Sequence, residues 1–334
     1  MRTTPGRLAA AGAALLAVVL LFLWLLPSNT YIFLPDRAHP VAPIVDVQGG
    51  KNPTDGGGIY FVDIFVRKAT LLERIWPGIH EGAQLVPASA VVPKGTSEKQ
   101  RRQEDAREMT RSQQVAAAVA LRAAGYKVDA NPTGVLVEQV DPRVPAAGKL
   151  QPSDVIVSAN GKRVRAPGDL RRVVGALRPG ATVRLVVRRG DTQTRVDVRT
   201  VRDADGRTII GVIVDQAAFI KLPLRVKIDA GNVGGPSAGL AFALDVLEEL
   251  GKDIDHGRRI AATGQIELDG TVTSIGGIRQ KTIGVRNSGI RFFVVPAGEN
   301  AAEARRYAHG VRILAVRNFQ QALHELATLP AGAK

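Results

Sequence analysis

The chain has 334 residues, of which 45% are hydrophobic and 23% are charged, a balance typical of globular proteins and not of disordered or collagen-like chains. It has no cysteine, which excludes disulfide scaffolds, zinc–cysteine sites, iron–sulfur clusters and thiol nucleophiles. Lys and Arg outnumber Asp and Glu by 45 to 31, a net charge of +14, but only 4% of residues are aromatic and the basic residues are scattered. Few side chains can stack on bases, so we expect no nucleic-acid partner.

The uncharged run LAAAGAALLAVVLLFLWLL at residues 8–26 is the first feature to explain. At about 1.5 Å per residue, a helix of this length nearly spans a bilayer core of about 30 Å. Arg2 and Arg7 precede the run, and basic flanks stay in the cytoplasm. We therefore predict a cytoplasmic tail at residues 1–7, a single-pass transmembrane helix at 8–26 and an extracytoplasmic remainder. A cleaved signal peptide is the alternative, although no small-residue cleavage site follows the run.

Residues 28–124 are expected to form a juxtamembrane β-hairpin and a helical segment. Two apolar runs, IVDV at residues 44–47 and IYFVDIFV at 59–66, have the composition of strands and are separated by a glycine-rich turn. The sequence from Thr96 to Ala124 is rich in Glu, Gln, Arg and Ala, with apolar residues three to four positions apart. This spacing predicts an amphipathic helix that packs on a neighbouring element.

Residues 125–203 carry short strands and turns in a characteristic order. GVLVEQV at residues 134–140 is a predicted strand, and DVIVSANG at 154–161 is a second strand that ends in an Asn-Gly turn. A helix over Asp169–Leu177 and a further strand over Val183–Arg188 follow. This order resembles that of bacterial PDZ domains.

The PDZ resemblance implies that an extended peptide pairs with a strand edge beside the helix, while backbone amides bind its terminal carboxylate. The carboxylate loop is predicted at Gly125, Tyr126, Lys127 and Val128. The same residues also suit the end of the preceding helix followed by a spacer. For the whole module, the alternative is a β-rich spacer with a blocked groove.

A glycine-rich turn, DAGNVGGP at residues 229–236, leads into a predicted helix that begins at Ser237. A serine in this place can simply cap the helix. The glycines favour catalysis, since residues without Cβ let a substrate backbone approach and amides at a helix start can stabilise an oxyanion. We therefore assign Gly234, Gly235 and Ala238 to an oxyanion and substrate loop. The chain contains no GxxxxGK[ST] phosphate-binding motif.

A serine nucleophile needs a base, and none of the five histidines lies in an HExxH pattern or a triad motif. Lysine is the alternative base, because burial disfavours its charged form. The candidate is Lys281, in a predicted helix whose apolar residues Ile278 and Ile283 can hold the amine out of water. The competing interpretation is a solvated surface lysine, as most lysines are.

Four ordered motifs in the last third of the chain resemble the proteolytic domain of Lon-type serine peptidases. They are GGPSAG at residues 234–239, ATGQIELDG at 262–270, SIGGIRQK at 274–281 and RFFVVPAGEN at 291–300. The resemblance implies that Ser237 is the nucleophile, that Lys281 is its base and that Thr263 orients the lysine. Gln265 and Gly234 stand where many relatives have acids, so no acidic role is carried over to these positions.

The complete layout is similar to that of YlbL-like membrane-anchored peptidases: α+β, with a single transmembrane helix, a PDZ-like module at 125–203 and a Lon-type α/β domain at 204–330. The resemblance implies an ATP-independent serine endopeptidase that cleaves unfolded or flexible extracytoplasmic polypeptides, needs no cofactor or metal and assembles into a homo-oligomer at the cell membrane. A non-catalytic membrane adaptor that binds peptide tails is the alternative function.

Overall fold

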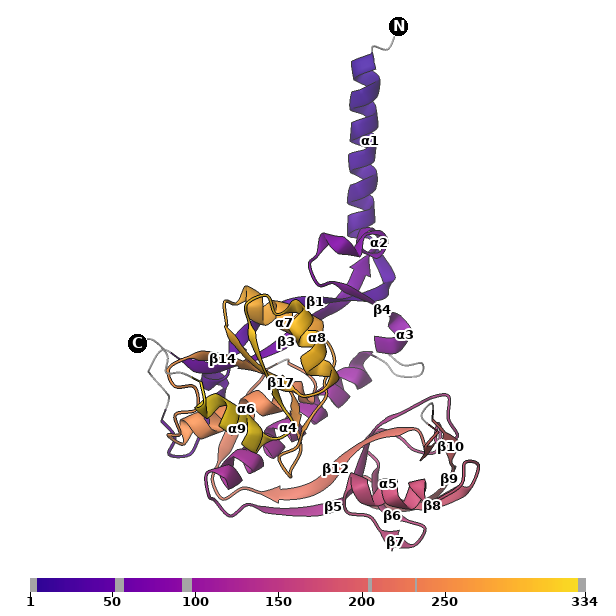
Figure 1. The fold of residues 1–334 in the computed structure, drawn as a ribbon. Helices are drawn as coiled ribbons and strands as arrows, with labels where there is room; N and C mark the ends of the chain where they lie inside the picture. Colours follow the sequence, from indigo (N-terminus) through magenta and orange to yellow (C-terminus); the bar gives the residue numbers. More distant parts are fainter. Residues whose placement is uncertain (1–4, 52–56, 92–97, 204–205, 232, 330–334) are drawn as a thin grey trace. The chain divides into compact units, whose positions relative to one another are not determined.

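The computed structural model describes residues 5–51, 57–91, 98–203, 206–231 and 233–329 (Figure 1). The chain forms two compact units. The first unit combines residues 1–126 with 224–334, and the second consists of residues 127–223. The second unit is thus an insertion within the first.

Helix α1 covers Pro5–Leu25. It begins at a proline, which suits a first helical turn because the missing N–H needs no partner there. Its large apolar side chains between Leu15 and Leu25 are mostly exposed. In the described part of the chain, no helix has the length and apolarity needed to cross a membrane. The expected helix at residues 8–26 is present, and its transmembrane role stays a prediction.

The first unit is built on a six-stranded sheet with the order β18-β17-β14-β3-β1-β4. Strands β1 and β3 are antiparallel, whereas β3, β14, β17 and β18 run parallel to one another. The strands are β1 (Pro27–Pro40), β3 (Gly58–Thr70), β4 (Gln84–Pro87), β14 (Arg259–Ala262), β17 (Phe292–Pro296) and β18 (Arg312–Val316).

Helices cover both faces of this sheet. Two consecutive residues of β3 show this, since neighbouring residues of a strand point to opposite faces. On β3, Phe61 contacts Phe242 of one helix layer, with 6.0 Å between the ring centroids. The next residue, Val62, packs in a cluster with Ile278 and Phe293 on the other face. The longer helices of this unit after α1 are α4 (Glu98–Ala123), α6 (Gly239–Glu249), α7 (Ile278–Asn287), α8 (Glu299–Tyr307) and α9 (Phe319–Ala327).

The hairpin predicted from residues 44–47 and 59–66 is wrong in its pairing. Val45–Val47 forms strand β2, which pairs with β13 (Val226–Ile228), while β3 pairs with β1. Strand β1 contains prolines at its ends and in its middle. Because proline is disfavoured in strands, the sequence does not predict a strand there. The helix expected from Thr96 is confirmed as α4, and its residues 115–121 are buried against α6.

The second unit is a sheet with the order β12-β5-β6-β8-β9, to which the short β7 adds next to β6. Asn160 and Gly161 form the predicted turn between β6 and β7, with φ of 49° and 77°. Helix α5 packs near β11 and β12. The elements are β5 (Asp129–Val140), β6 (Val155–Ala159), β7 (Lys162–Arg163), α5 (Pro167–Gly175), β8 (Thr182–Arg189), β9 (Thr192–Arg199), β10 (Val201–Arg202), β11 (Thr208–Ile209) and β12 (Val212–Lys221).

These units differ from the predicted domains at 28–124, 125–203 and 204–330. Residues 28–124 supply strands and a helix to the first unit instead of a separate juxtamembrane segment. Strand β12 belongs to the second unit because it pairs with β5 over ten residues. The remaining elements are α2 (Leu71–Ile75), α3 (Ala88–Val91), β15 (Gln265–Ile266), β16 (Val272–Thr273) and the 3-10 turns η1 (Ala42–Ile44), η2 (Pro77–Ile79) and η3 (Pro236–Ala238).

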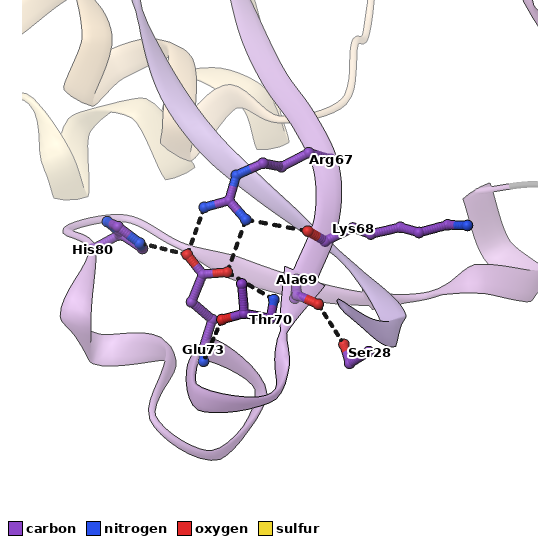
Figure 2. A network of polar contacts seen from close by, with 7 residues as sticks. All are labelled: Ser28, Arg67, Lys68, Ala69, Thr70, Glu73 and His80. Carbon is purple, nitrogen blue, oxygen red and sulfur yellow. Dashed lines mark hydrogen bonds and ion pairs between the residues drawn. The ribbon is translucent and has the colours of Figure 1, made fainter. Parts of the chain in front are cut away.

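A polar network fixes the short helix α2 after β3 (Figure 2). The fully buried carboxylate of Glu73 accepts hydrogen bonds from the guanidinium of Arg67 and from the backbone N–H of Thr70, and lies 2.7 Å from Nε2 of His80. In return the Thr70 hydroxyl accepts the Glu73 N–H, which completes a capping box. The hydrogen bond from Arg67 is the main reason why the pKa of Glu73 falls to about 2.

Candidate active site

Ser237 lies in the one-turn helix η3, between the glycine-rich turn and helix α6. Gly235 before it has φ of 81° and ψ of 160°, a conformation that glycine adopts without strain. Ser237 is not the N-cap residue of either helix, because η3 is capped by Gly235 and α6 by Ala238. The hydroxyl is therefore available for other partners, and the capping interpretation does not describe this serine.

Lys281 occupies the first turn of helix α7 and is only 2% exposed. The helix starts after Gly277, whose φ of 69° lies in the left-handed region that glycine tolerates. The ammonium Nζ lies 2.6 Å from Oγ of Ser237 and 3.1 Å from Oγ1 of Thr263. The structure thus brings the predicted nucleophile, base and orienting residue together.

Thr263, immediately after β14, ties the serine loop to the sheet. Its Oγ1 donates to the carbonyl of Ser237 at 3.0 Å, and the N–H of Gly264 donates to the same carbonyl at 2.8 Å. The N–H of Thr263 donates to the carbonyl of Val294 on β17. Because Thr263 contacts both Ser237 and Lys281, it sets the position of one relative to the other.

Burial lowers the pKa of Lys281 to about 8. The predicted apolar neighbours Ile278 and Ile283 are 1% and 2% exposed, in agreement with a dry environment for the amine. The carboxylate of Asp63 on β3 acts in the opposite direction and raises the pKa of Lys281. A lysine with this pKa is neutral in a useful fraction of molecules near neutral pH, as a general base requires.

Asp63 is a residue that the sequence did not single out. It carries a raised pKa, mainly because of burial and then because of the charge of Asp36, while His39 lowers it. The Nε2 atom of His39 lies 3.7 Å from Asp63 and 3.5 Å from Asp36. These three side chains form one charged group beside the lysine, and their oxygens and nitrogen lie close enough to hold a metal ion.

Gly234, Gly235 and Ala238 surround Ser237 as expected for a substrate loop. Gly234 is exposed, and a Cβ added to Gly235 would have no atom within 4 Å, so there is open space beside this backbone. Ala238, in contrast, is buried. The loop therefore presents its glycine backbone to solvent on one side and packs against the unit on the other.

Ser112 on α4 supports this loop from behind, a contact without a signal in the sequence. Its hydroxyl donates to the carbonyl of Pro236 at 3.0 Å. A Cβ added to Gly239 would lie 2.8 Å from Oγ of Ser112 and 3.1 Å from Cγ2 of Ile266. Gly239 is needed here because α4 and β15 approach the start of α6 so closely.

The structure does not form a carboxylate loop from Gly125, Tyr126, Lys127 and Val128. The N–H of Gly125 donates to the carbonyl of Arg122, and the N–H of Tyr126 donates to the carbonyl of Leu121. Gly125 has φ of 94°, and both amides are used to end helix α4. The alternative interpretation, a helix end followed by a spacer, describes these residues.

Strand β12 offers a different edge for a peptide. It is the terminal strand of its sheet, with β5 as its neighbour among the described residues, and helix α5 packs near it. The loop before β12 contains Gly211, whose φ is 70° and whose Cβ position would overlap Val144. Ile213 and Phe219 on β12 are 57% and 63% exposed. An edge strand beside a helix is the arrangement that β-augmentation requires.

Two protein families match this chain. Residues 107–200 match the PDZ domain family, and residues 207–326 match the Lon protease (S16) C-terminal proteolytic domain. Lon protease 2 of Bacillus subtilis is 34% identical over 116 residues, which are 35% of this chain and 20% of that protein. Lon protease of Mesomycoplasma hyopneumoniae is 30% identical over 118 residues, 32% of this chain and 13% of that protein.

The chain thus spans a fifth or less of the length of these curated relatives. Among solved structures, the PDZ domain of an SdrC-like protein from Listeria monocytogenes is 26% identical and covers 25% of this chain and 87% of that one, with a TM-score of 0.24. The chain therefore combines a PDZ domain with a Lon-type proteolytic domain, as the resemblance to YlbL-like proteins implied.

Proposed function

We propose that this protein is a serine endopeptidase that uses Ser237 and Lys281 as a catalytic dyad. The distance of 2.6 Å between Lys281 Nζ and Ser237 Oγ is the observation that carries the proposal. A hydrogen bond of this length is short enough for direct transfer of the serine proton. The match to the Lon proteolytic domain supports the same chemistry.

In the proposed reaction, neutral Lys281 accepts the proton of Ser237 as Oγ attacks the scissile carbonyl. The C–N bond then breaks, and Lys281 gives the proton to the leaving amine. In the second half, Lys281 takes a proton from water as the water oxygen attacks the acyl carbon. The ester bond to Ser237 Oγ then breaks, Lys281 returns the proton to Oγ, and the acid product leaves. Thr263 holds the amine towards Ser237 throughout, and the backbone around Gly234, Gly235 and Ala238 faces the developing oxyanion.

We propose that substrates are unfolded or flexible polypeptides and that cleavage does not need ATP. The 334 residues contain no GxxxxGK[ST] motif that would bind ATP phosphates. Without coupled ATP hydrolysis, stably folded proteins would not be unfolded at the site. The open space beside Gly235 suits an extended chain, because its backbone can approach closely.

The PDZ unit is proposed to capture substrates along strand β12. An extended segment would pair with the strand edge beside helix α5, and exposed Ile213 would contact an apolar side chain of that segment. This edge replaces the carboxylate loop predicted at 125–128. Capture would supply affinity, while the chemistry would remain in the proteolytic unit.

Membrane attachment and assembly complete the proposal. The uncharged run at residues 8–26, preceded by Arg2 and Arg7, supports a single-pass anchor with the N-terminus in the cytoplasm and both units outside. This placement rests on the sequence. A homo-oligomer is proposed because the packing of subunits would restrict access to the site.

A non-catalytic adaptor is the competing function, and turnover separates the two. The full chain and its Ser237→Ala variant would be incubated with an unfolded polypeptide, and released peptides would be identified by mass spectrometry. Thr194→Ala, which removes an exposed hydroxyl group from β9 of the second unit, is the control. We expect cleavage by the wild type and the control and none by Ser237→Ala. Equal amounts of product from all three would refute the dyad.

A further inference from the structure

Both tryptophans of the chain lie at one corner of the first unit, where helix α1 ends. Trp24 is 43% exposed, and Trp76, between α2 and η2, is 66% exposed. Ile75 and Ile79 on either side of Trp76 are 71% and 38% exposed. We call these four side chains the apolar corner. Single exposed apolar side chains are normal on a protein surface, whereas a group of large ones marks an interaction site.

A backbone hydrogen bond places the apolar corner at the level where α1 ends. The N–H of Leu71, the first residue of α2, donates to the carbonyl of Leu26 at 2.9 Å. Helix α2 has five residues, so Trp76 lies no more than roughly 8 Å from Leu71 along the helix axis. The ring centroids of Trp24 and His80 lie 6.4 Å apart, and His80 directly follows η2. The headgroup layer on each side of a bilayer is about 5–8 Å thick, so it covers the same span.

The polar network around Glu73 holds the apolar corner in place (Figure 2). Arg67 connects β3 to α2 through Glu73, and the contact between Glu73 and His80 connects α2 to the end of η2. A Cβ added to Gly78 in η2 would lie 3.3 Å from Nε1 of Trp76, so the indole packs closely on this turn. The apolar side chains are therefore exposed on a hydrogen-bonded structure and not on an unsupported loop.

The segment after η2 packs directly on α7, the helix that carries the proposed base. Nε2 of the fully buried Gln280 donates to the carbonyl of Gly82 at 2.8 Å. Arg286, on the same helix, donates to Oε1 of Glu81 at 2.6 Å. A Cβ added to Gly82 would overlap Cδ1 of Ile283. Because these contacts join the apolar corner to α7, a partner that binds the corner also fixes the orientation of the helix that carries the base.

We propose that the apolar corner inserts into the headgroup layer of the membrane at the end of α1, as a second membrane contact besides that helix. This contact rests on the membrane attachment proposed above. Tryptophan concentrates in the headgroup layer, because its indole combines an apolar body with an N–H that forms hydrogen bonds there. Arg74, exposed on α2 beside Ile75, provides a positive charge for lipid phosphates. A membrane is favoured over a protein partner, because the headgroups around the end of α1 would already occupy the space beside the corner.

The test uses fluorescence, since the chain has only two tryptophans. Trp24→Phe leaves Trp76 as the sole indole, and Trp76→Phe leaves Trp24. Each full-length variant would be reconstituted into nanodiscs of phosphatidylcholine and phosphatidylglycerol. Phosphatidylcholine with bromine on its acyl chains near the headgroup is the quencher in the lipid, and iodide is the quencher in water. The control is Phe219→Trp in a chain without either native tryptophan, because Phe219 has a similar exposure of 63% on the second unit.

We expect the brominated lipid to quench Trp76 at least about twofold and to leave Phe219→Trp unchanged, because an interfacial indole contacts the upper acyl chain. Iodide should quench Trp76 at least about twofold less than it quenches Phe219→Trp, since the headgroup layer shields the indole. Equal quenching of the two by iodide, or equal quenching by the lipid, would overturn the proposal. Protection of Trp76 from iodide without quenching by the lipid would assign the corner to a protein partner, a second copy of this chain included, and would overturn it as well.

The Trp24 signal tests the anchor separately from the apolar corner. If the lipid quenches Trp24 and not Trp76, α1 is in the membrane and the second contact is refuted. If it quenches neither, the anchor is refuted together with the second contact. Quenching of Trp76 supports the second contact whatever Trp24 shows. Peptide cleavage is not measured, so the result does not depend on the proposed peptidase activity.

Discussion

Lys281 donates a hydrogen bond of 2.6 Å to Ser237, although the two residues are 44 positions apart in the chain. Neither side chain is held by its own helix alone. Thr263 contacts both residues from the end of β14, and the carbonyl of Ser237 accepts from Thr263 and Gly264. The position of Ser237 relative to Lys281 therefore depends on Thr263 and Gly264 at the end of β14 as well as on the two helices.

Lys281→Arg should be as inactive as Lys281→Ala. A guanidinium stays protonated and cannot accept the serine proton, so both variants should lose at least about 100-fold in kcat/KM, the usual contribution of a general base. Peptide hydrolysis by the wild type and by Lys252→Arg, at an exposed lysine in the turn after α6, provides the comparison. Substantial turnover by Lys281→Arg, with its Tm unchanged, would show that the amine does not serve as the base.

Activity of the wild type should rise with pH and level off above about 8, the pKa of Lys281, because the base must be neutral. Asp63→Asn should move this rise to lower pH, since the Asp63 carboxylate favours the charged amine and raises its pKa. The profile of kcat/KM against pH for a short unfolded peptide measures both effects. An unchanged profile in Asp63→Asn would show that Asp63 does not affect the pKa of Lys281. Asp191→Asn, which removes an exposed carboxylate elsewhere, controls for the loss of charge.

Lys281→Met should stabilise the fold at pH 7. The pKa of the amine falls from 10.5 in the unfolded chain to about 8 in the native one, which corresponds to roughly 3 kcal/mol of destabilisation. The lost hydrogen bonds to Ser237 and Thr263 reduce this gain. Between pH 8 and 10.5 the lysine is protonated in the unfolded chain but neutral in the native one, so the stability of the wild type rises with pH over this range. The stabilisation by Lys281→Met should therefore be complete below about pH 8 and vanish above 10.5. Chemical denaturation across pH measures it, and a variant less stable than wild type at pH 7 contradicts it.

Gly239→Ala should destabilise the protein and slow cleavage. The added Cβ would lie 2.8 Å from Oγ of Ser112, and overpacking of this kind costs about 1–3 kcal/mol. Gly175→Ala is the control, because its Cβ would have no atom within 4 Å in helix α5. Denaturant unfolding of both variants gives the comparison. Equal stability of the two variants would show that Ser112 on α4 can move aside for the added methyl group without loss of free energy.

Ile213→Asp should weaken cleavage of long unfolded substrates that use strand β12, through a higher KM with kcat preserved. The charge would replace an apolar side chain that is 57% exposed at the proposed capture edge. Thr194→Asp, on β9 at the opposite edge of the same sheet, is the control. A short peptide that contacts only the proteolytic unit should be cleaved equally by both. An unaltered KM for long substrates would place capture elsewhere.

The sequence motifs single out Ser237, Lys281 and Thr263, and the structure places the three residues in contact, while their catalytic roles stay a proposal. Asp63 could not be found in this way. It occupies one position of an apolar strand, and its relation to Lys281 depends on the packing of helix α7 against β1 and β3. Contacts between elements far apart in sequence leave no local pattern.

The carboxylate loop at residues 125–128 was predicted wrongly for a different reason. Gly125 suits both a carboxylate loop and a helix end, since each needs a positive φ, and the sequence does not distinguish them. The hydrogen bonds of Gly125 and Tyr126 to the last turn of helix α4 distinguish the two, and they depend on the folded backbone. Similarly, the prolines in β1 disguise it as a loop in the sequence, so the sequence does not show that β1 is the partner of β3.

The insertion of the PDZ unit also fixes an order of folding during synthesis. Strand β3 pairs with β14, and residue Ile59 meets Ile260 only after the whole of residues 127–223 has emerged. The inserted unit closes on itself through Asp129 and Lys221, so it can fold first and bring the two flanking segments close together. The nucleophile and its base consequently meet only when the chain is almost complete, and an unfinished chain carries no assembled dyad.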